Sequence, residues 1–164
     1  LTYKNTETEH TESQDYPLLT SWLAVIGMIT MYWSPVERSI DQCVHFLHQE
    51  KQIEKSKPTR LNGKLEFIKK YMPETILAAD TLVELSASTK QAVQIRDVLV
   101  HGIINSYDEQ KIEIGKIKGK SGDHLIEVFT IDKNRLNKSA QALSYLGENW
   151  GKLATALLHH AKNA

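Results

Sequence analysis

Apolar residues recur at intervals of three and four positions through most of the chain, a spacing that predicts helices. The first predicted helix begins at Pro17, because proline suits the first helical turn, and it is apolar around much of its surface. A narrower apolar stripe follows at positions 36–47. Between them, Ser34-Pro35-Val36-Glu37 has the form of a capping box with proline at the first helical position. Either a second helix begins here, or one long helix is kinked at Pro35.

The middle of the chain divides into shorter helical segments. Positions 61–72 predict a short helix that Pro73 stops, and the same proline opens the next helix. The polar run 86–89 predicts a break, where a serine or threonine hydroxyl caps a fresh helix that ends at His101.

After this helix the pattern changes to a period of two. Alternation over positions 111–114 and the β-branched residues of 125–131 predict two strands. Gly115 is expected at a bulge, and positions 119–123 are expected to form the turn. The two strands predict a β-hairpin, which must pack on the helices or on another subunit because an isolated hairpin is marginally stable in water.

A long last helix completes the predicted fold, with Asp132 as its cap. Its apolar stripe consists of Leu136, Ala140, Leu143, Leu146, Trp150, Leu153 and Leu157. The fold class expected is therefore mainly α: an up-and-down bundle of four to five helices with one β-hairpin before the C-terminal helix. Residues 1–16 are polar and aperiodic and are expected to form a flexible arm, while residues 17–164 form a single helical domain.

Composition limits the classes of function. The 164 residues include 20 Lys plus Arg and 20 Asp plus Glu, so the formal net charge is zero, which argues against a broad basic face for long duplex nucleic acid. The single Cys43 lies on an apolar stripe, so a buried thiol and a cytoplasmic location are expected. The longest apolar run, 18–33, is interrupted by polar residues and preceded by an acidic segment, so neither a membrane span nor a signal peptide is expected.

Candidate chemistry gathers at the end of the helix that closes at Gly102, a glycine expected to adopt the left-handed conformation. Arg96, Asp97 and His101 place a cation, a carboxylate and a titratable base at one helix terminus. Asp97 and His101 lie about 40° apart on a helical wheel, and the long Arg96 side chain can reach the same surface. The structural alternative is a salt-bridged helix end with a C-capping histidine, which the helix dipole favours.

Other polar groups are open to two interpretations. Lys116 and Lys118 belong to a lysine cluster on the predicted hairpin, which either protects a solvent-exposed edge or contacts phosphate as a flap. His45 and His48 lie one turn apart and could bind a metal. Exposed surface positions without a metal are expected instead, both for them and for the pair at 159–160. No metal or cofactor is expected, because the sequence has no glycine-rich phosphate loop and no paired-cysteine motif.

Arg96, Asp97 and His101 also resemble the catalytic motif of HEPN domains (higher eukaryotes and prokaryotes nucleotide-binding). That motif is an Arg, directly followed by a polar residue, usually Asn, Asp or His, and a His a few residues later. The stretch Trp33-Ser34-Pro35-Val36-Glu37 is similar to a Trp-Ser-x-x-Glu found early in some uncharacterised HEPN-like proteins. In those proteins an Arg-Asn/Asp…His-Gly stretch, a hairpin and a long last helix follow, so the likeness runs over positions 18–160.

The resemblance implies a metal-independent endoribonuclease of toxin type that acts on single-stranded RNA. His101 would be the base or the acid, Arg96 would bind the scissile phosphate, and Asp97 would orient either of them or contact its partner copy. One histidine cannot serve both ends of the reaction at once, so a homodimer with two facing motifs is implied. Glu37 would face Arg96 from the core, as an alternative to being a capping carboxylate. Asp97 stands where Asn is common in the family, and a carboxylate there partly neutralises Arg96.

Two other functions remain open: a non-catalytic helical interaction module that keeps the motif as a structural cluster, and a nucleotide-binding or antitoxin-associated subunit. The very apolar first helix favours a homodimer, whose interface is expected to include the helix ending at His101. A buried and mutually satisfied motif would favour the structural module, whereas an accessible motif would favour the nuclease.

Overall fold

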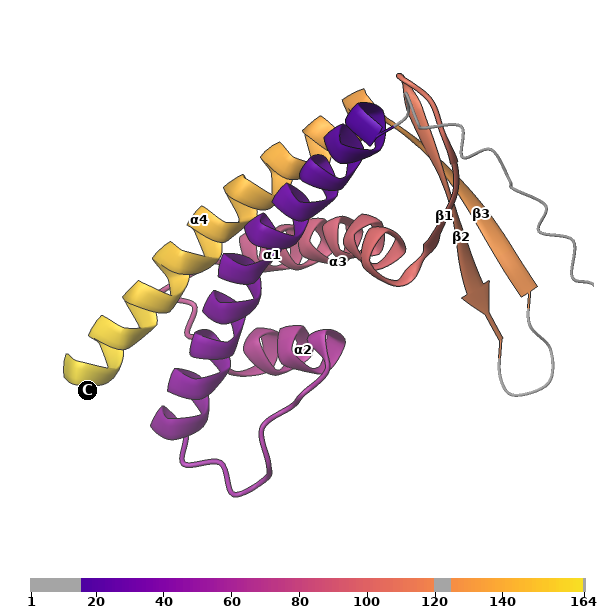
Figure 1. The fold of residues 1–164 in the computed structure, drawn as a ribbon. Helices are drawn as coiled ribbons and strands as arrows, with labels where there is room; N and C mark the ends of the chain where they lie inside the picture. Colours follow the sequence, from indigo (N-terminus) through magenta and orange to yellow (C-terminus); the bar gives the residue numbers. More distant parts are fainter. Residues whose placement is uncertain (1–15, 120–124, 164) are drawn as a thin grey trace, which may run out of the picture.

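The computed structural model describes residues 16–119 and 125–163. Its elements are α1 (Tyr16–Glu50), α2 (Leu61–Tyr71), α3 (Ala79–His101), β1 (Ile103–Tyr107), β2 (Lys111–Lys118), β3 (Leu125–Asp132) and α4 (Lys133–Asn163). The expected mainly helical fold with a small antiparallel sheet before the last helix is confirmed. Figure 1 shows the sheet at one end of the helices. Positions 1–15 of the predicted arm and 120–123 of the predicted turn lie outside the described residues, and Tyr16 already belongs to α1.

The most extensive contact in the fold joins α1 and α4, which run in the same direction (Figure 1). Near their N-terminal ends the Lys133 ammonium lies over the Trp22 ring, and near their C-terminal ends His160 Nε2 lies 3.8 Å from Glu50 Oε1. The four helices therefore do not alternate as in an up-and-down bundle, where the first and fourth helices are antiparallel. The sheet explains the difference, because it returns the chain to the start of α1, where Trp22 Nε1 donates to the Asp108 carbonyl (2.8 Å).

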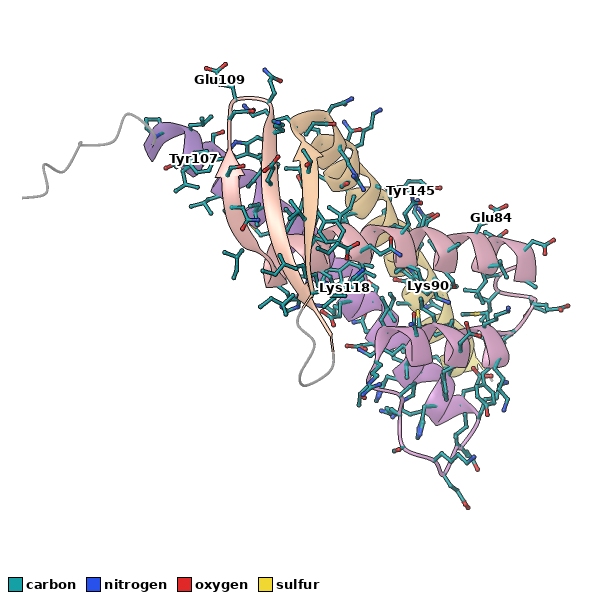
Figure 2. The ribbon with its side chains drawn as sticks, turned by 90° about the vertical axis from the view of Figure 1, so that its right-hand side faces the viewer. Glu84, Lys90, Tyr107, Glu109, Lys118 and Tyr145 are labelled. Atoms are coloured by element: carbon teal, nitrogen blue, oxygen red, sulfur yellow. The ribbon has the colours of Figure 1, made fainter. Side chains whose placement is uncertain are left out.

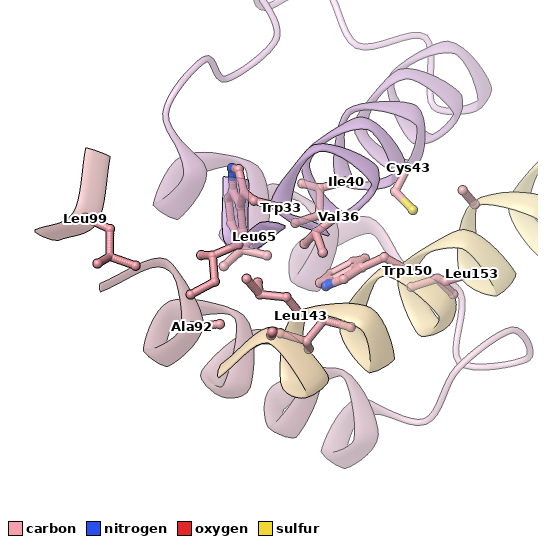
Figure 3. Close-up of a cluster of buried hydrophobic side chains, with 14 of the residues drawn as sticks. Trp33, Val36, Ile40, Cys43, Leu65, Ala92, Leu99, Leu143, Trp150 and Leu153 are labelled. Atoms are coloured by element: carbon pink, nitrogen blue, oxygen red, sulfur yellow. The ribbon is translucent and has the colours of Figure 1, made fainter. Parts of the chain in front are cut away.

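All four helices and one face of the sheet contribute to a single core. Figure 3 shows side chains from the four helices meeting in one cluster. The stripe predicted for α4 is buried throughout: Leu136, Ala140, Leu143, Leu146, Trp150, Leu153 and Leu157. The Cys43 thiol is buried as expected, and burial raises its pKa to about 12, so the thiol stays protonated at neutral pH.

α1 is a single helix that contains Pro35, so the alternative of a second helix starting at Ser34 is wrong. Proline removes one backbone hydrogen bond from a helix. Here Trp33 and Val36, on either side of it, are 4% and 0% exposed, so tertiary packing holds the helix together across the missing bond. Glu37 consequently lies inside the helix and has no N-terminus to cap.

The outer face of the first half of α1 is apolar. Positions 17–36 include no charged residue, and Leu23 and Met31 are 51% and 73% exposed. By length and composition α1 is the one described helix that could cross a membrane, a criterion that core helices of soluble proteins also meet. Its opposite face, with Trp22 and Ile29 fully buried, belongs to the core.

α3 runs unbroken from Ala79 to His101, so the predicted break at 86–89 is wrong. The hydroxyl of Thr89 is satisfied inside the helix: it donates to the Leu85 carbonyl (2.7 Å) and accepts from Trp150 Nε1 (2.9 Å). The start predicted at Pro73 is also too early, because residues 73–78 form turns ahead of α3. α2 ends one residue before the predicted limit.

The sheet has three antiparallel strands in the order β1-β2-β3, one strand more than the predicted hairpin. The sequence pattern does not reveal β1, because its register shifts between Ile104 and Ser106 and breaks the alternation. The irregularity lies in β1 and not at Gly115, where it is expected from the sequence. Gly115 is still constrained, since a Cβ there would lie 2.9 Å from Asn105 Nδ2.

The two faces of the sheet differ in environment. Ile112, Ile114 and Ile131 are buried on the inner face, against the helices. The outer face carries exposed apolar side chains, with exposed fractions between 55% and 67%: Ile103, Ile117, Ile126 and Val128. Cross-strand pairing brings Ile103 and Val128 to either side of Gly115 and sets Ile117 opposite Ile126, so these residues form one patch, here called the outer sheet patch.

Two aspartates fix the ends of strands. Asp132 Oδ1 accepts from the backbone N–H of Arg135 (2.6 Å), which confirms the predicted cap of α4. Asp108 Oδ1 accepts from the backbone N–H groups of Gln110 (2.7 Å) and Lys111 (2.8 Å) in the turn between β1 and β2. These two hydrogen bonds lower the pKa of the Asp108 carboxyl, because they stabilise its charged form.

Candidate functional site

The last two turns of α3 hold Arg96, Asp97 and His101. Arg96 Nη1 lies 3.1 Å from Asp97 Oδ1, and the two side chains are 24% and 40% exposed. His101 is the last residue of α3; it is exposed and makes no hydrogen bond or ion pair with any other described residue. The structure therefore pairs Arg96 with Asp97. His101, one turn further along the helix, is exposed and has no partner among the described residues.

Arg96 stands on the buried side of α3. Its position follows Ala92 by four residues and precedes Leu99 by three, so the three side chains share one face of the helix. Ala92 and Leu99 are 8% and 7% exposed. Arg96 Nε is buried and has no hydrogen-bond partner among the described residues. An unpaired buried donor costs roughly 1–3 kcal/mol. Three oxygen atoms of the described residues are also buried without a partner: Glu50 Oε2, Ser86 Oγ and Glu127 Oε2.

Gly102 ends α3, but not in the conformation expected from the sequence. Its φ of −93° and ψ of 167° are extended, so the left-handed prediction is wrong. Glycine is required here for space: a Cβ would lie 2.1 Å from Ile114 Cγ2 and 2.5 Å from the Val98 carbonyl oxygen. The close approach of β2 therefore fixes the backbone directly after His101.

Exposed apolar side chains surround His101 in the sequence. Val100 is 39% exposed and Ile103 is 64% exposed. Ile103 is also the first residue of β1 and a member of the outer sheet patch. His101 therefore lies beside an apolar surface, which the Arg96, Asp97 and His101 motif does not reveal. Its signal in the sequence is the β-branched apolar residues that flank the pair His101-Gly102.

Lys116 and Lys118 lie at the end of the sheet where α3 joins β1. Ile103 pairs with Gly115, so β2 continues past the start of β1 by three residues, 116–118, about 10 Å at roughly 3.3 Å per residue. Figure 2 shows Lys118 at the opposite end of the sheet from Glu109. Lys116 is half-buried, and Lys118 forms an ion pair with Glu127 on β3. These lysines give the end of the sheet near His101 positive charge, part of which Glu127 neutralises.

Glu37 is exposed on the outer side of α1, so the expectation that it faces Arg96 from the core is wrong. It lies with Ser34, Arg38 and Asp41 along an open surface. The period of α1 accounts for this, because Trp33, Val36 and Ile40 occupy the buried face and leave position 37 outside.

The two histidines of α1, His45 and His48, have neighbours of their own. His45 Nδ1 lies 2.7 Å from Lys57 Nζ, and His48 Nε2 lies 2.7 Å from the Lys55 carbonyl oxygen, with its ring stacked on Phe67. Both are half-buried where surface positions are expected. Within residues 16–119 and 125–163, no group of three or more His, Cys, Asp or Glu side chains is arranged to hold a metal ion.

No protein-family model, curated protein or solved structure matches the chain. The chemistry of the candidate site therefore follows from its own residues alone. It offers an accessible imidazole, a guanidinium with a buried unpaired Nε, and a carboxylate that accepts from that guanidinium. Such a set can move a proton and bind an oxyanion, which are the two tasks of phosphodiester cleavage beside a 2′-hydroxyl.

Proposed function

We propose that the chain is a metal-independent endoribonuclease that acts on single-stranded RNA as a homodimer, with Arg96 and His101 of two copies at one composite site. The observation that carries the proposal is the accessibility of the motif: His101 is exposed and makes no hydrogen bond or ion pair with a described residue, and the side chains of Arg96 and Asp97 are 24% and 40% exposed. A purely structural cluster would be buried and would use its bonding groups internally. The Arg-Asp-x-x-x-His resemblance to HEPN domains agrees in chemistry with this geometry.

In the proposed reaction, the imidazole of one His101 takes the proton of the 2′-hydroxyl, whose oxygen attacks the adjacent phosphorus. The bond from phosphorus to the 5′-oxygen breaks, and the His101 imidazolium of the partner copy donates a proton to that leaving oxygen. The products are a 2′,3′-cyclic phosphate and a 5′-hydroxyl. Arg96 stabilises the negative charge that develops on the phosphate oxygens. Asp97 holds the guanidinium through the 3.1 Å contact.

Two exposed apolar surfaces support self-association. Ile103 begins the outer sheet patch two residues after His101, and in a two-fold interface the residues near the axis meet their own copies. A copy seated near Ile103 would bring the second His101 close to the first. The uncharged outer face of α1 is a further surface of the kind that a monomer rarely leaves open.

Lys116 and Lys118 are the proposed contacts to RNA phosphates beyond the scissile bond. Both extend from the end of β2 that lies nearest to the start of β1. Because the whole chain has no net charge, such binding is local and covers few nucleotides.

The proposal is tested by passing purified protein through size exclusion with light scattering and assaying each fraction on single-stranded RNA in the presence of EDTA. Cleavage is expected in the dimer fractions, without added metal, and to yield 2′,3′-cyclic phosphate ends. A monomer at micromolar concentration contradicts the composite site. Stoichiometric zinc or manganese in protein purified without added metal, together with loss of cleavage in EDTA, contradicts the metal-independent mechanism.

The second candidate is a non-catalytic helical interaction module, which the Arg96–Asp97 contact favours. A carboxylate at 3.1 Å partly neutralises the guanidinium and thereby weakens its attraction for phosphate. In this alternative Asp97 serves only to stabilise the end of α3. Removing its charge by Asp97→Asn distinguishes the two functions.

A further inference from the structure

A cavity of about 410 Å³ lies between α3, β3 and α4, and none of the motif residues lines it. Its apolar wall comes from two elements that are far apart in the sequence: Ile95 and Val98 of α3, and Phe129 and Ile131 of β3. The volume lies within the roughly 300–1,000 Å³ typical of sites for small ligands.

Two cations stand at the α4 side of this cavity. Arg135 and Lys138 both line it, both are exposed, and neither makes an ion pair with another described residue. The backbone that carries Arg135 is fixed on both sides, because its N–H donates to Asp132 (2.6 Å) and its carbonyl accepts from the Ser139 hydroxyl (2.8 Å). No acidic side chain of the described residues lines the cavity.

The neighbouring cavity along the same two helices provides a contrast. It measures about 360 Å³ and also lies between α3 and α4, but its lining includes Glu84. Its one lysine, Lys152, is held by Glu148 at 2.6 Å. The arrangement of two unpaired cations without a carboxylate is therefore a property of the first cavity and not of the α3–α4 groove as a whole.

We propose that the cavity between α3, β3 and α4 binds a small carboxylate with an apolar body, of the medium-chain alkyl type. The carboxylate would accept hydrogen bonds from Arg135 and Lys138, while its chain would replace water against Ile95, Val98 and Phe129. Arg135 supplies a planar fork that matches the two carboxylate oxygens, and Lys138 supplies a second charge beside it. This inference does not depend on the ribonuclease activity, because the motif lies outside the cavity.

A ligand series tests the proposal on the unaltered protein. Binding of octanoate, octanol and acetate is measured by titration calorimetry and by NMR line shifts. Octanoate is expected to bind about tenfold or more tightly than octanol, which lacks the charge, and than acetate, which lacks the chain. Equal binding of octanoate and octanol would overturn the proposal, and so would the absence of octanoate binding at millimolar concentration.

Variants then locate the site. Arg135→Gln combined with Lys138→Gln is expected to weaken octanoate binding about tenfold or more. Ala142→Phe fills the cavity from α4 and is expected to abolish binding, and Lys69→Gln on α2 is the control that removes a distant exposed charge and changes nothing. These α4 positions are exposed, so the variants should fold, and thermal unfolding checks that they do. Octanoate binding that is unaltered in the double variant would place the ligand elsewhere, for example on the apolar face of α1, and would overturn the assignment.

Discussion

Thr89 in the middle of α3 and His101 at its end differ in how the fold uses their polar groups. In the middle, Thr89 is fully buried and its hydroxyl both donates to Leu85 and accepts from Trp150, so every bonding group is used. At the end, Arg96 Nε is buried without a partner among the described residues, and His101 is exposed. Both lie on one continuous helix that packs against the same core. The fold satisfies Thr89 and leaves the imidazole of His101 exposed, and we propose that the partner of His101 is a substrate.

The largest effect is expected from removing the guanidinium. Arg96→Ala should reduce cleavage of single-stranded RNA by about 10²-fold or more, the scale for losing an oxyanion-stabilising group. Arg96→Lys should restore only part of the rate, because lysine lacks the planar fork that matches phosphate. Cleavage rates of the three proteins at equal dimer concentration test this. If lysine restores the full rate, the bidentate role is wrong.

Gly102→Ala should disturb both fold and site. A Cβ at 2.1 Å from Ile114 Cγ2 and 2.5 Å from the Val98 carbonyl forces β2 or the end of α3 to move, at a cost of about 1–3 kcal/mol. Denaturant unfolding should show this loss, and cleavage should fall as His101 is displaced. Gly147→Ala is the matched control, because a Cβ there meets Pro35 at an ordinary 3.6 Å. Equal stability of the two variants would contradict the close packing of β2 against Gly102.

Thr89→Val should affect the fold and leave the chemistry unchanged. The change leaves Trp150 Nε1 buried without an acceptor, which costs about 1–3 kcal/mol of unfolding free energy. The rate of RNA cleavage by folded protein should not change. Combining it with Trp150→Phe should cost less than the sum of the two single changes, because both remove the same hydrogen bond. Additive losses of unfolding free energy would show that the hydrogen bond between Trp150 and Thr89 contributes no coupling energy.

How far the sequence predicts the molecule depends on how local each signal is. The stripe of α4 and its Asp132 cap follow from spacing within a few turns, and the structure has both. The predicted break at 86–89 fails because Thr89 is satisfied by Trp150, 61 residues away, which no local pattern shows. The sequence does not predict β1, because the bulge at Ile104–Ser106 interrupts the alternation of apolar and polar positions.

The candidate site shows the same difference between local features, which the sequence predicts, and long-range contacts, which it does not. The three motif residues are visible in the sequence, but the prediction from sequence does not place Arg96 on the same face as the buried Ala92 and Leu99. The unpaired state of Arg96 Nε depends on what surrounds the guanidinium in three dimensions and could not be predicted. The prediction that Glu37 faces Arg96 rests on the resemblance alone, and Glu37 is exposed because α1 continues as one helix across Pro35.

The smallest change, Asp97→Asn, distinguishes the two candidate functions. In the nuclease it removes a charge that competes with phosphate for Arg96, so cleavage should stay equal or rise modestly. In the structural module it breaks the 3.1 Å ion pair and lowers only the melting temperature, by the small amount expected of a partly exposed pair. Rate and melting temperature measured on the same preparation decide between them.

The central claim is that the end of α3 is a site and not a stabilising cluster, and the most direct test is His101→Ala assayed for both RNA cleavage and thermal unfolding. We expect the wild-type dimer to cleave single-stranded RNA in EDTA and the variant to be about 10²-fold slower or more, with an unchanged melting temperature, because His101 is exposed and bonds to no described residue. A clean wild-type protein that cuts no RNA would contradict the claim. So would a variant that cuts as fast as wild type while unfolding at a lower temperature.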